Sequence, residues 1–171
     1  QLDEEIRDRF GGDLEAAERG ELDHWANDTT GMLALVTLLD QFSRNLHRGT
    51  PDAFRNDQHA QTLLSGFIAD GKDESLTVPQ KLLLYHPLHH AEDIEQQRLC
   101  VAKFRELEKS CSEAWRPVVE ATVTFIVEHC EIIEQFGRFP HRNNVLGRDS
   151  TAEELAFLEK DPRNYGQAGD D

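Results

Sequence analysis

The segment FGRFPHRNNVLGRDST, residues 136–151, concentrates side chains that bind anions and carry protons. It contains three arginines, one histidine and two asparagines, although the whole chain has a formal net charge of −15. Guanidinium groups are planar forks that fit carboxylate and phosphate groups, and imidazole titrates near neutral pH. We therefore predict that His141 carries a proton beside an anionic ligand. The predicted ligand-binding residues of this segment are Arg138, Arg142, Asn143 and Arg148.

A second group of polar residues lies on helix faces that the sequence predicts to be buried. Asp40, Arg44 and Arg48 follow one another at four-residue spacing along a predicted helix. His90 is predicted to share a helix face with apolar residues, and His129 falls within the apolar stripe of a later helix. A buried polar group is costly unless it is paired, so these side chains must meet one another or a ligand. We predict the first three as ligand-binding residues and His90 as a second candidate for proton transfer.

Two other interpretations use the same residues. In the first, the arginines pair with Asp40, Glu92 and Asp93 and hold a long loop against the helices, because an irregular buried segment needs partners for its backbone groups. In the second, His89 and Asp93 bind a metal ion, since they lie four residues apart. However, Pro87 interrupts the geometry of this histidine cluster and no H-E-x-x-H pattern is present. We therefore predict no metal and no cofactor.

The composition argues against several classes of partner and chemistry. The chain has 33 acidic residues against 18 Lys and Arg, which disfavours a nucleic acid or an anionic membrane surface as partner. It has no apolar run of the roughly 18 residues needed to span a bilayer. Neither a G-x-S-x-G pattern nor a P-loop is present. The cysteines are odd in number and lack C-x-x-C spacing, so we expect buried thiols in a cytoplasmic protein.

Helices with short connections must position these residues. Apolar residues recur with a period near 3.6, and no segment alternates with a period of two. We therefore predict an all-α single domain, residues 1–160, of about seven or eight antiparallel helices. The tail, residues 161–171, is predicted to be frayed, and the N-terminus is predicted to be truncated because the chain opens inside a helix.

Turn and capping residues set the expected helix boundaries. Glycines are predicted to divide the opening stretch, residues 2–26, into two short helices. Ser150 and Glu153 form a predicted capping box for the last helix, residues 151–160. The breaks are expected at Gly11-Gly12 and Gly20, and a cap is expected at Thr29 or Thr30 for a helix that ends near Asn45. The other helices are expected at about 57–70, in a short piece that stops before Pro87, at 90–109 and at 114–136. In 114–136 the predicted buried stripe is Val118, Ala121, Phe125, Ile132 and Phe136.

Four segments of the chain resemble a known bacterial family. They are RFG at 9–11, LLDQFSRNLHRGTPDAF at 38–54, LLLYHPLHHAEDIEQQ at 82–97 and FGRFPHRNNVLGRDSTAEELAFL at 136–158. The family is catalogued as domain of unknown function 924, and the resemblance covers nearly the whole chain. It implies a tetratricopeptide-like superhelical fold and carries no established activity.

The family's motif positions overlap the polar residues chosen above and add two more candidates. In this chain they are Asp40, Gln41, Arg44, Asn45, Arg48, His90, Glu92, Arg138, His141, Arg142, Asn143 and Arg148. On the strength of this resemblance, Asn45 and Glu92 join the predicted ligand-binding residues. The chain departs from the family pattern at His89 and Ala91, which stand where an acid and a serine are usual, so any chemistry of those two side chains is changed here.

Two functions remain open on this evidence. The first is a small-molecule binder or enzyme whose partner is a phosphate- or carboxylate-bearing metabolite. The alternative is a tetratricopeptide-like protein–protein interaction domain that binds a peptide or protein, in which the arginine-rich loop is purely structural. The sequence indicates neither a reaction nor an oligomeric state.

Overall fold

The computed structural model describes residues 2–160 of the chain, and every regular element in that range is helical. The prediction of an all-α fold is confirmed, whereas the predicted frayed tail lies outside the described residues. The α-helices are α1 (Leu2–Glu18), α2 (Thr29–Val36), α3 (Ser43–Leu46), α4 (Asp57–Ala69), α5 (Val78–Leu84), α6 (His86–His89), α7 (Ile94–Ser110), α8 (Arg116–Phe136) and α9 (Ala152–Lys160). The other helical elements are the 3-10 helices η1 (Asp23–Asn27), η3 (Pro51–Phe54) and η4 (Pro140–Arg142) and the π-helix η2 (Thr37–Phe42).

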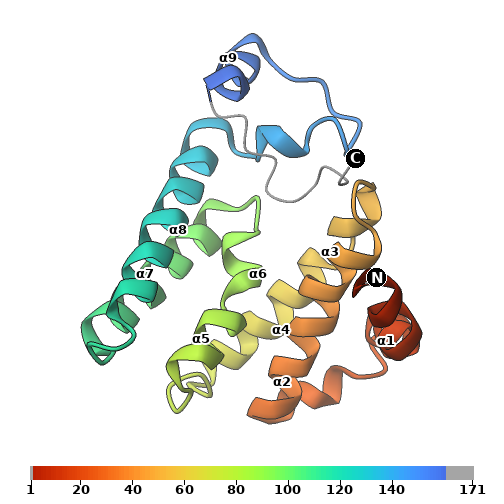
Figure 1. Ribbon diagram of the computed structural model, residues 1–171, viewed down its shortest axis with the longest axis vertical. Helices are drawn as coiled ribbons and strands as arrows, with labels where there is room; N and C mark the ends of the chain where they lie inside the picture. The colour runs from red at the N-terminus through yellow and green to blue at the C-terminus, as the bar shows by residue number, and fades with distance from the viewer. Residues whose placement is uncertain (1, 161–171) are drawn as a thin grey trace.

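Several of these elements join into continuous rods. The elements α2, η2 and α3 run without a break, and only the turn at Tyr85 separates α5 from α6. The described residues thus form seven rods in one domain, as predicted. In Figure 1, α7 and α8 stand on one side, the α2–η2–α3 rod and α4 on the other, and α5 and α6 between them. The tetratricopeptide-like superhelix stays a prediction.

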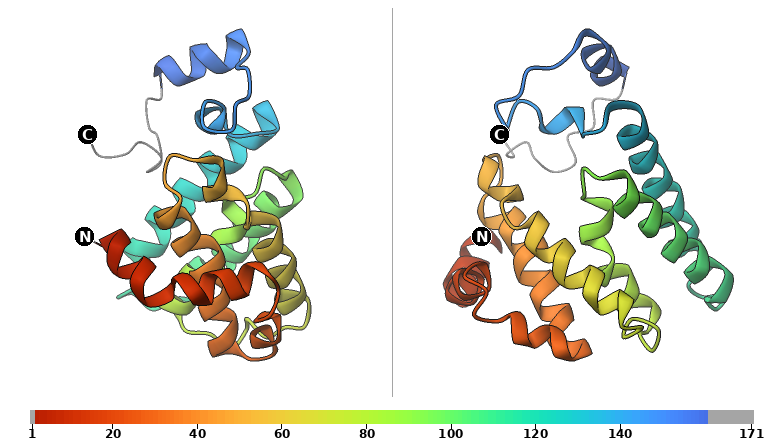
Figure 2. Two further views of the ribbon diagram at one scale, coloured as in Figure 1. Left: turned by 90° about the vertical axis from the view of Figure 1, so that its right-hand side faces the viewer. Right: turned by 180° about the vertical axis from the view of Figure 1, so that it is seen from behind.

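The first helix is longer than predicted. It runs unbroken through Gly11-Gly12, so the predicted break there is wrong, and it ends just before Gly20, whose φ is 75°. A glycine inside a helix costs only about 1 kcal/mol. The buried side chains of Leu14 and Ala17 lie beyond the two glycines, and their packing holds the helix together. Figure 2 shows α1 lying across the α2–η2–α3 rod, against which it packs.

Two helix caps lie one residue away from their predicted positions. Asp28 caps α2 by accepting a hydrogen bond of 3.0 Å from the backbone N–H of Gly31. A capping box opens α9, but it is formed by Thr151 and Glu154. The Thr151 N–H donates to Glu154 at 2.7 Å, and the Glu154 N–H donates to the Thr151 hydroxyl at 3.2 Å. Both pairs satisfy N–H groups that the first turn of a helix leaves without partners.

The helix that carries Gln97 begins later than predicted. Asp93 is its N-cap and accepts a hydrogen bond of 2.9 Å from the N–H of Gln96, so α7 starts at Ile94. His90 therefore lies in the turn after α6 and not on α7, which corrects the predicted shared face. Pro87 stands in the first turn of α6, a position that proline tolerates.

The buried face of α8 differs from the predicted stripe. Val119, Val123 and Ile126 are buried against the rest of the core, whereas Val118 and Phe125 are 47% and 38% exposed. This helix carries apolar residues on two faces, and a period of 3.6 cannot tell which face packs. The predicted boundaries are correct, because Pro117 lies in the first turn and Gly137 ends the helix with a φ of 69°.

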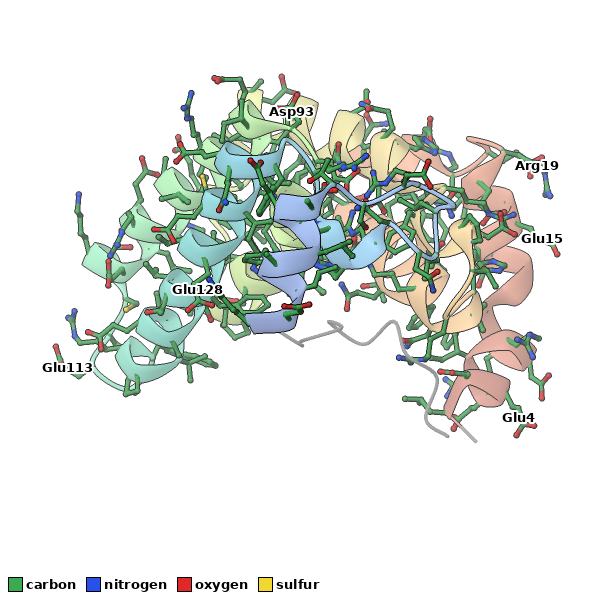
Figure 3. All side chains as sticks on the ribbon, turned by 90° about the horizontal axis from the view of Figure 1, so that it is seen from above. Glu4, Glu15, Arg19, Asp93, Glu113 and Glu128 are labelled. Atoms are coloured by element: carbon green, nitrogen blue, oxygen red, sulfur yellow. The ribbon has the colours of Figure 1, made fainter. Side chains whose placement is uncertain are left out.

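The apolar core has three parts. The largest connects α2, α4, α5, α6, α7 and α8, a second packs α1 on the α2–η2–α3 rod, and a third joins α8 to Phe139. Figure 3 shows charged side chains at the periphery, such as Arg19 just after α1 and Glu113 in the turn between α7 and α8. Within residues 2–160, a membrane-spanning helix would need a longer apolar stretch than any helix provides.

Candidate functional site

A cavity of about 670 Å³ opens between the α2–η2–α3 rod, α6, α8 and the loop that follows α8. Figure 1 shows this loop passing from the end of α8 toward the end of α3, above α6. The polar lining residues are Gln41, Arg44, Asn45, Arg48, His86, His89, His90, Thr122, His129, His141 and Arg142. The apolar lining residues are Phe54, Leu82, Phe104, Phe125 and Ile126. Six predicted site residues thus lie around one space, although they come from three separate segments.

The π-helix η2 places a carboxylate beneath this cavity. Asp40 is almost completely buried, and its carboxylate lies 2.6 Å from Nδ1 of His90. The same carboxylate accepts hydrogen bonds from Arg44 at 3.2 Å and from the side-chain amide of Gln41. Single π-helical turns often occur at functional sites. A carboxylate that holds an imidazole by Nδ1 fixes its tautomer and its orientation.

The charge states of this pair follow from burial and from the neighbouring guanidinium group. Burial opposes ionisation of Asp40, but His90 and Arg44 outweigh it and hold the pKa of Asp40 well below its usual range. Burial and the positive charge of Arg44 lower the pKa of His90 to about 3. At neutral pH the imidazole is therefore neutral, donates its Nδ1 hydrogen to Asp40 and presents Nε2 as a proton acceptor. A general base must be unprotonated, as this imidazole is, but a pKa near 3 makes it a weak proton acceptor.

Arginine side chains form the part of the cavity lining next to the Asp40–His90 pair. Arg44 donates to Asp57 at 2.9 Å in addition to Asp40, and Arg142 lies 3.7 Å from Asp57. Arg48 also lines the cavity, so three guanidinium groups lie around it, and the carboxylates of Asp40 and Asp57 lie beside two of them. Arg48 also approaches the exposed carboxylate of Asp3 at 3.8 Å, a contact that water screens. The cavity lining thus gathers guanidinium groups although the whole chain is acidic.

Arg142 links the cationic lining to the histidine. Its side chain is buried, lies over the rings of Phe54 and Phe139 at 4.7 and 4.5 Å, and donates a hydrogen bond of 3.0 Å to the His90 carbonyl oxygen. Burial and the nearby charge of Arg44 lower the pKa of Arg142 to about 10, so the group is still charged at neutral pH. An arginine held between two rings keeps a fixed direction, which suits recognition of a planar or tetrahedral anion.

Histidines contribute more to the lining than the sequence indicated. His86, His89 and His129 join the two predicted histidines there, and the rings of His89 and His90 have centroids 4.1 Å apart. Burial, together with the charge of His90, keeps the pKa of His89 well below its ordinary value. Among residues 2–160, no group of three or more histidine, cysteine or acidic side chains is arranged to hold a metal ion. The sequence signals for this enlargement were the predicted inward direction of His129 and the histidine cluster around Pro87, which was considered there only as a metal site.

Five predicted ligand-binding residues lie outside the cavity lining, namely Asp40 beneath it and Glu92, Arg138, Asn143 and Arg148. Arg138 forms a two-point ion pair with Glu154 at 2.6 and 2.8 Å, and it lowers the pKa of Glu154 to about 2. Arg148 forms a second two-point pair, with Glu92, at 2.6 and 2.9 Å. Asn143 accepts a hydrogen bond of 3.0 Å from Arg148. These contacts fasten the loop to the turn between α6 and α7 and to α9, so it holds Arg142 and His141 over the cavity.

The remaining contacts explain how this loop keeps its shape. Glu92 accepts a hydrogen bond of 2.8 Å from the backbone N–H of Phe139, and Arg148 donates to the Phe139 carbonyl at 3.2 Å. Burial raises the pKa of Glu92, but Arg148 and the Phe139 N–H reverse this effect and lower it. The interpretation of loop arginines as backbone partners therefore describes Arg138, Arg142 and Arg148, which donate to the carbonyl oxygens of Asp149, His90 and Phe139. Of these three, Arg142 also lines the cavity, as do Arg44 and Arg48.

Comparisons with known proteins identify a family and a related structure. The chain matches, over residues 1–162, the family model described as bacterial protein of unknown function (DUF924). It is also similar to a solved structure described as a protein of unknown function, ATU0120, from Agrobacterium tumefaciens. The two chains are 36% identical with a TM-score of 0.76, and the alignment covers 93% of this chain and 84% of the other. No curated protein matches the chain.

Proposed function

Because the chain belongs to the DUF924 family of bacterial proteins, whose function is unknown, we propose a function from its cavity: it binds a small molecule that carries a phosphate or carboxylate group, and His90 takes a proton from that molecule. The observation that supports this proposal is the buried Asp40–His90 pair, 2.6 Å apart, inside a cavity with three guanidinium groups. An oriented neutral imidazole beside a bound anion is the arrangement of a general base and its substrate.

The proposed roles follow from the positions of the side chains. Arg48, which is half-exposed at the cavity edge, would meet the anion first, and Arg44 and Arg142 would fix it deeper. Asn45 and the histidine at position 141 would supply further polar contacts. Asp40 would act as a positioning residue that keeps Nε2 of His90 directed toward the ligand. The free, buried cysteines Cys100, Cys111 and Cys130 fit a cytoplasmic location for this activity.

The test is the effect of anions on thermal stability. A ligand that binds only the folded state raises the melting temperature, so phosphate, phosphate monoesters and dicarboxylates should each be compared with chloride at equal ionic strength. We expect Arg48→Gln, a change at the cavity edge, to reduce this stabilisation. Arg105→Gln, which removes an exposed arginine of α7 that pairs with Glu108, is the matched control and should leave it unchanged. Absence of stabilisation by every anion would end the proposal.

One observation favours a second candidate, the tetratricopeptide-like protein–protein interaction domain. Val118 and Phe125 are exposed apolar side chains on α8, and the exposed Trp115 is its N-cap residue. Exposed apolar residues are typical of contact surfaces when they lie together. On this alternative the arginine-rich loop is only scaffold, as the pairs formed by Arg138 and Arg148 would allow. It predicts that no small anion changes the melting temperature. Neither candidate involves a nucleic acid or a membrane.

A further inference from the structure

One face of α8 carries apolar side chains from the cavity to the far end of the helix. Thr122, Phe125 and His129 line the cavity, and Trp115 and Val118 precede them at spacings of three and four residues. At about 100° per residue, all five directions fall within roughly 80° of one another. Trp115, Val118 and Phe125 are 37%, 47% and 38% exposed, so this face stays open outside the cavity. We call these five residues the α8 face.

The cavity therefore has two walls of different chemistry. Arg44 and Arg48 of the α2–η2–α3 rod, with Arg142 of the loop, form the cationic wall. Phe125 and Ile126 of α8 lie on the opposite wall. An inorganic anion alone would satisfy the first wall and would leave the apolar wall in contact with water. A ligand that carries both an anionic group and an apolar body would use both walls.

We propose that the ligand of this site is an amphipathic organic anion, with its charged group at Arg44, Arg48 and Arg142 and its apolar chain along the α8 face toward Val118. This inference rests on the proposed function and names the class of molecule that the site takes. Charge complementarity decides which end of the ligand enters first, since the guanidinium groups lie in the cavity and the exposed apolar side chains lead out of it.

The dimensions of the α8 face set the length of chain that gains affinity. A helix rises 1.5 Å per residue, so the face extends for about 15 Å between Phe125 and Trp115. Each methylene that loses its contact with water gains about 0.8 kcal/mol, which corresponds to roughly fourfold in the dissociation constant. Partial exposure on the open face reduces this factor, and we expect about twofold to fourfold per methylene over the first several carbons.

A homologous series of ligands tests the inference. Methyl, butyl and octyl phosphate share one headgroup, and their dissociation constants can be measured by calorimetry below the concentration at which octyl phosphate forms micelles. We expect affinity to rise steadily along the series. Val118→Ser, outside the cavity lining, should weaken octyl phosphate and leave methyl phosphate unchanged. Phe125→Ala, in the lining, should weaken octyl phosphate more than methyl phosphate. Leu155→Ala, which removes an exposed apolar side chain of α9, is the control and should alter neither ligand.

The possible outcomes separate this inference from the proposed function. Equal affinity for the three phosphates would overturn the amphipathic ligand and leave the anion site standing. No binding of any of them would overturn both. If octyl phosphate gains nothing over methyl phosphate and the protein instead forms a dimer, or captures a peptide, in a manner that Val118→Ser abolishes, the α8 face is a protein contact and the inference fails. Because two separate α8 variants are used, one that fails to fold does not remove the test.

Discussion

Replacing Asp40 by asparagine removes one buried charge while preserving the shape of the side chain. The carboxylate is 1% exposed, lies 2.6 Å from His90 and 3.2 Å from Arg44, and is the only acid that contacts both of them in the described range. Removing one partner of a buried ion pair costs about 3–5 kcal/mol, because the other charge stays buried. Asp57 still pairs with Arg44 at 2.9 Å, so we expect a smaller loss of about 2–3 kcal/mol in the free energy of unfolding.

Urea unfolding followed by circular dichroism at pH 7 measures this loss, provided that the m-value of the variant equals that of the wild type. Asp52→Asn is the control, since Asp52 is 59% exposed and lies 3.9 Å from Arg55. Exposed pairs of this kind contribute about 0.2–1 kcal/mol at most. We therefore expect the control to change stability by less than about 0.5 kcal/mol.

The pH dependence of the loss gives an independent check. The folded-state pKa of Asp40 is lower than that of the unfolded chain, which is about 3.9. The unfolded chain therefore binds the proton first as the pH falls, so the stabilisation by Asp40 is complete above about pH 4 and declines below it. The difference in the free energy of unfolding between the wild type and Asp40→Asn should shrink as the pH falls below about 4. A variant as stable as the wild type at pH 7 would refute the assignment of Asp40 as a buried, paired carboxylate.

Three further predictions concern acid stability, helix contact and the loop. The pKa of His90 is lowered to about 3 from an ordinary 6.5, so between these values the unfolded chain binds a proton that the folded protein does not. The free energy of unfolding should therefore fall as the pH drops from about 6.5 to about 3. His90→Asn should flatten this dependence of stability on pH in urea titrations. Gly31→Ala should lower the free energy of unfolding by about 2 kcal/mol or more, because its Cβ would lie 2.2 Å from the Trp25 carbonyl oxygen. Gly66→Ala has open space around its Cβ and should raise the free energy of unfolding by up to about 1 kcal/mol in the same assay. Arg148→Lys keeps the charge but not the two-point pair, so it should cost about 1 kcal/mol and speed amide hydrogen exchange in residues 138–151; unchanged exchange there would show that the pair does not hold the loop.

Local signals in the sequence were sufficient for much of the fold. Pro117 and Gly137 mark both ends of α8, because proline fits the first helical turn and glycine the left-handed conformation after the last. The start of α7 was also readable, since Asp93 and Gln96 have the spacing of a cap and its third residue. The predicted start at residue 90 came from the apolar periodicity alone. Periodicity does not show which residue caps the first turn of a helix.

The division of the arginines could not be read from the sequence. Arg138, Arg142 and Arg148 belong to one short loop and have similar neighbours. Only the tertiary structure brings Glu154 to Arg138 and Glu92 to Arg148. It likewise places the ring of Phe54 against Arg142. The same reason applies to α8, where two faces carry apolar residues and only the position of α7 decides which of them is covered. Tertiary packing thus distinguishes the arginine that lines the cavity from those that only fasten the loop.

The π-helix η2 decides the direction in which the arginines that follow it point. A π-helical turn contains one residue more than the α-helical turn it replaces, so the two parts of the rod are offset by about 100° about a common axis. The residues before η2 pack into the core, and Arg44 and Arg48 follow it. Gain or loss of a single codon within Thr37–Phe42 is therefore enough to turn the guanidinium groups toward or away from the cavity, while the earlier part of the rod keeps its packing.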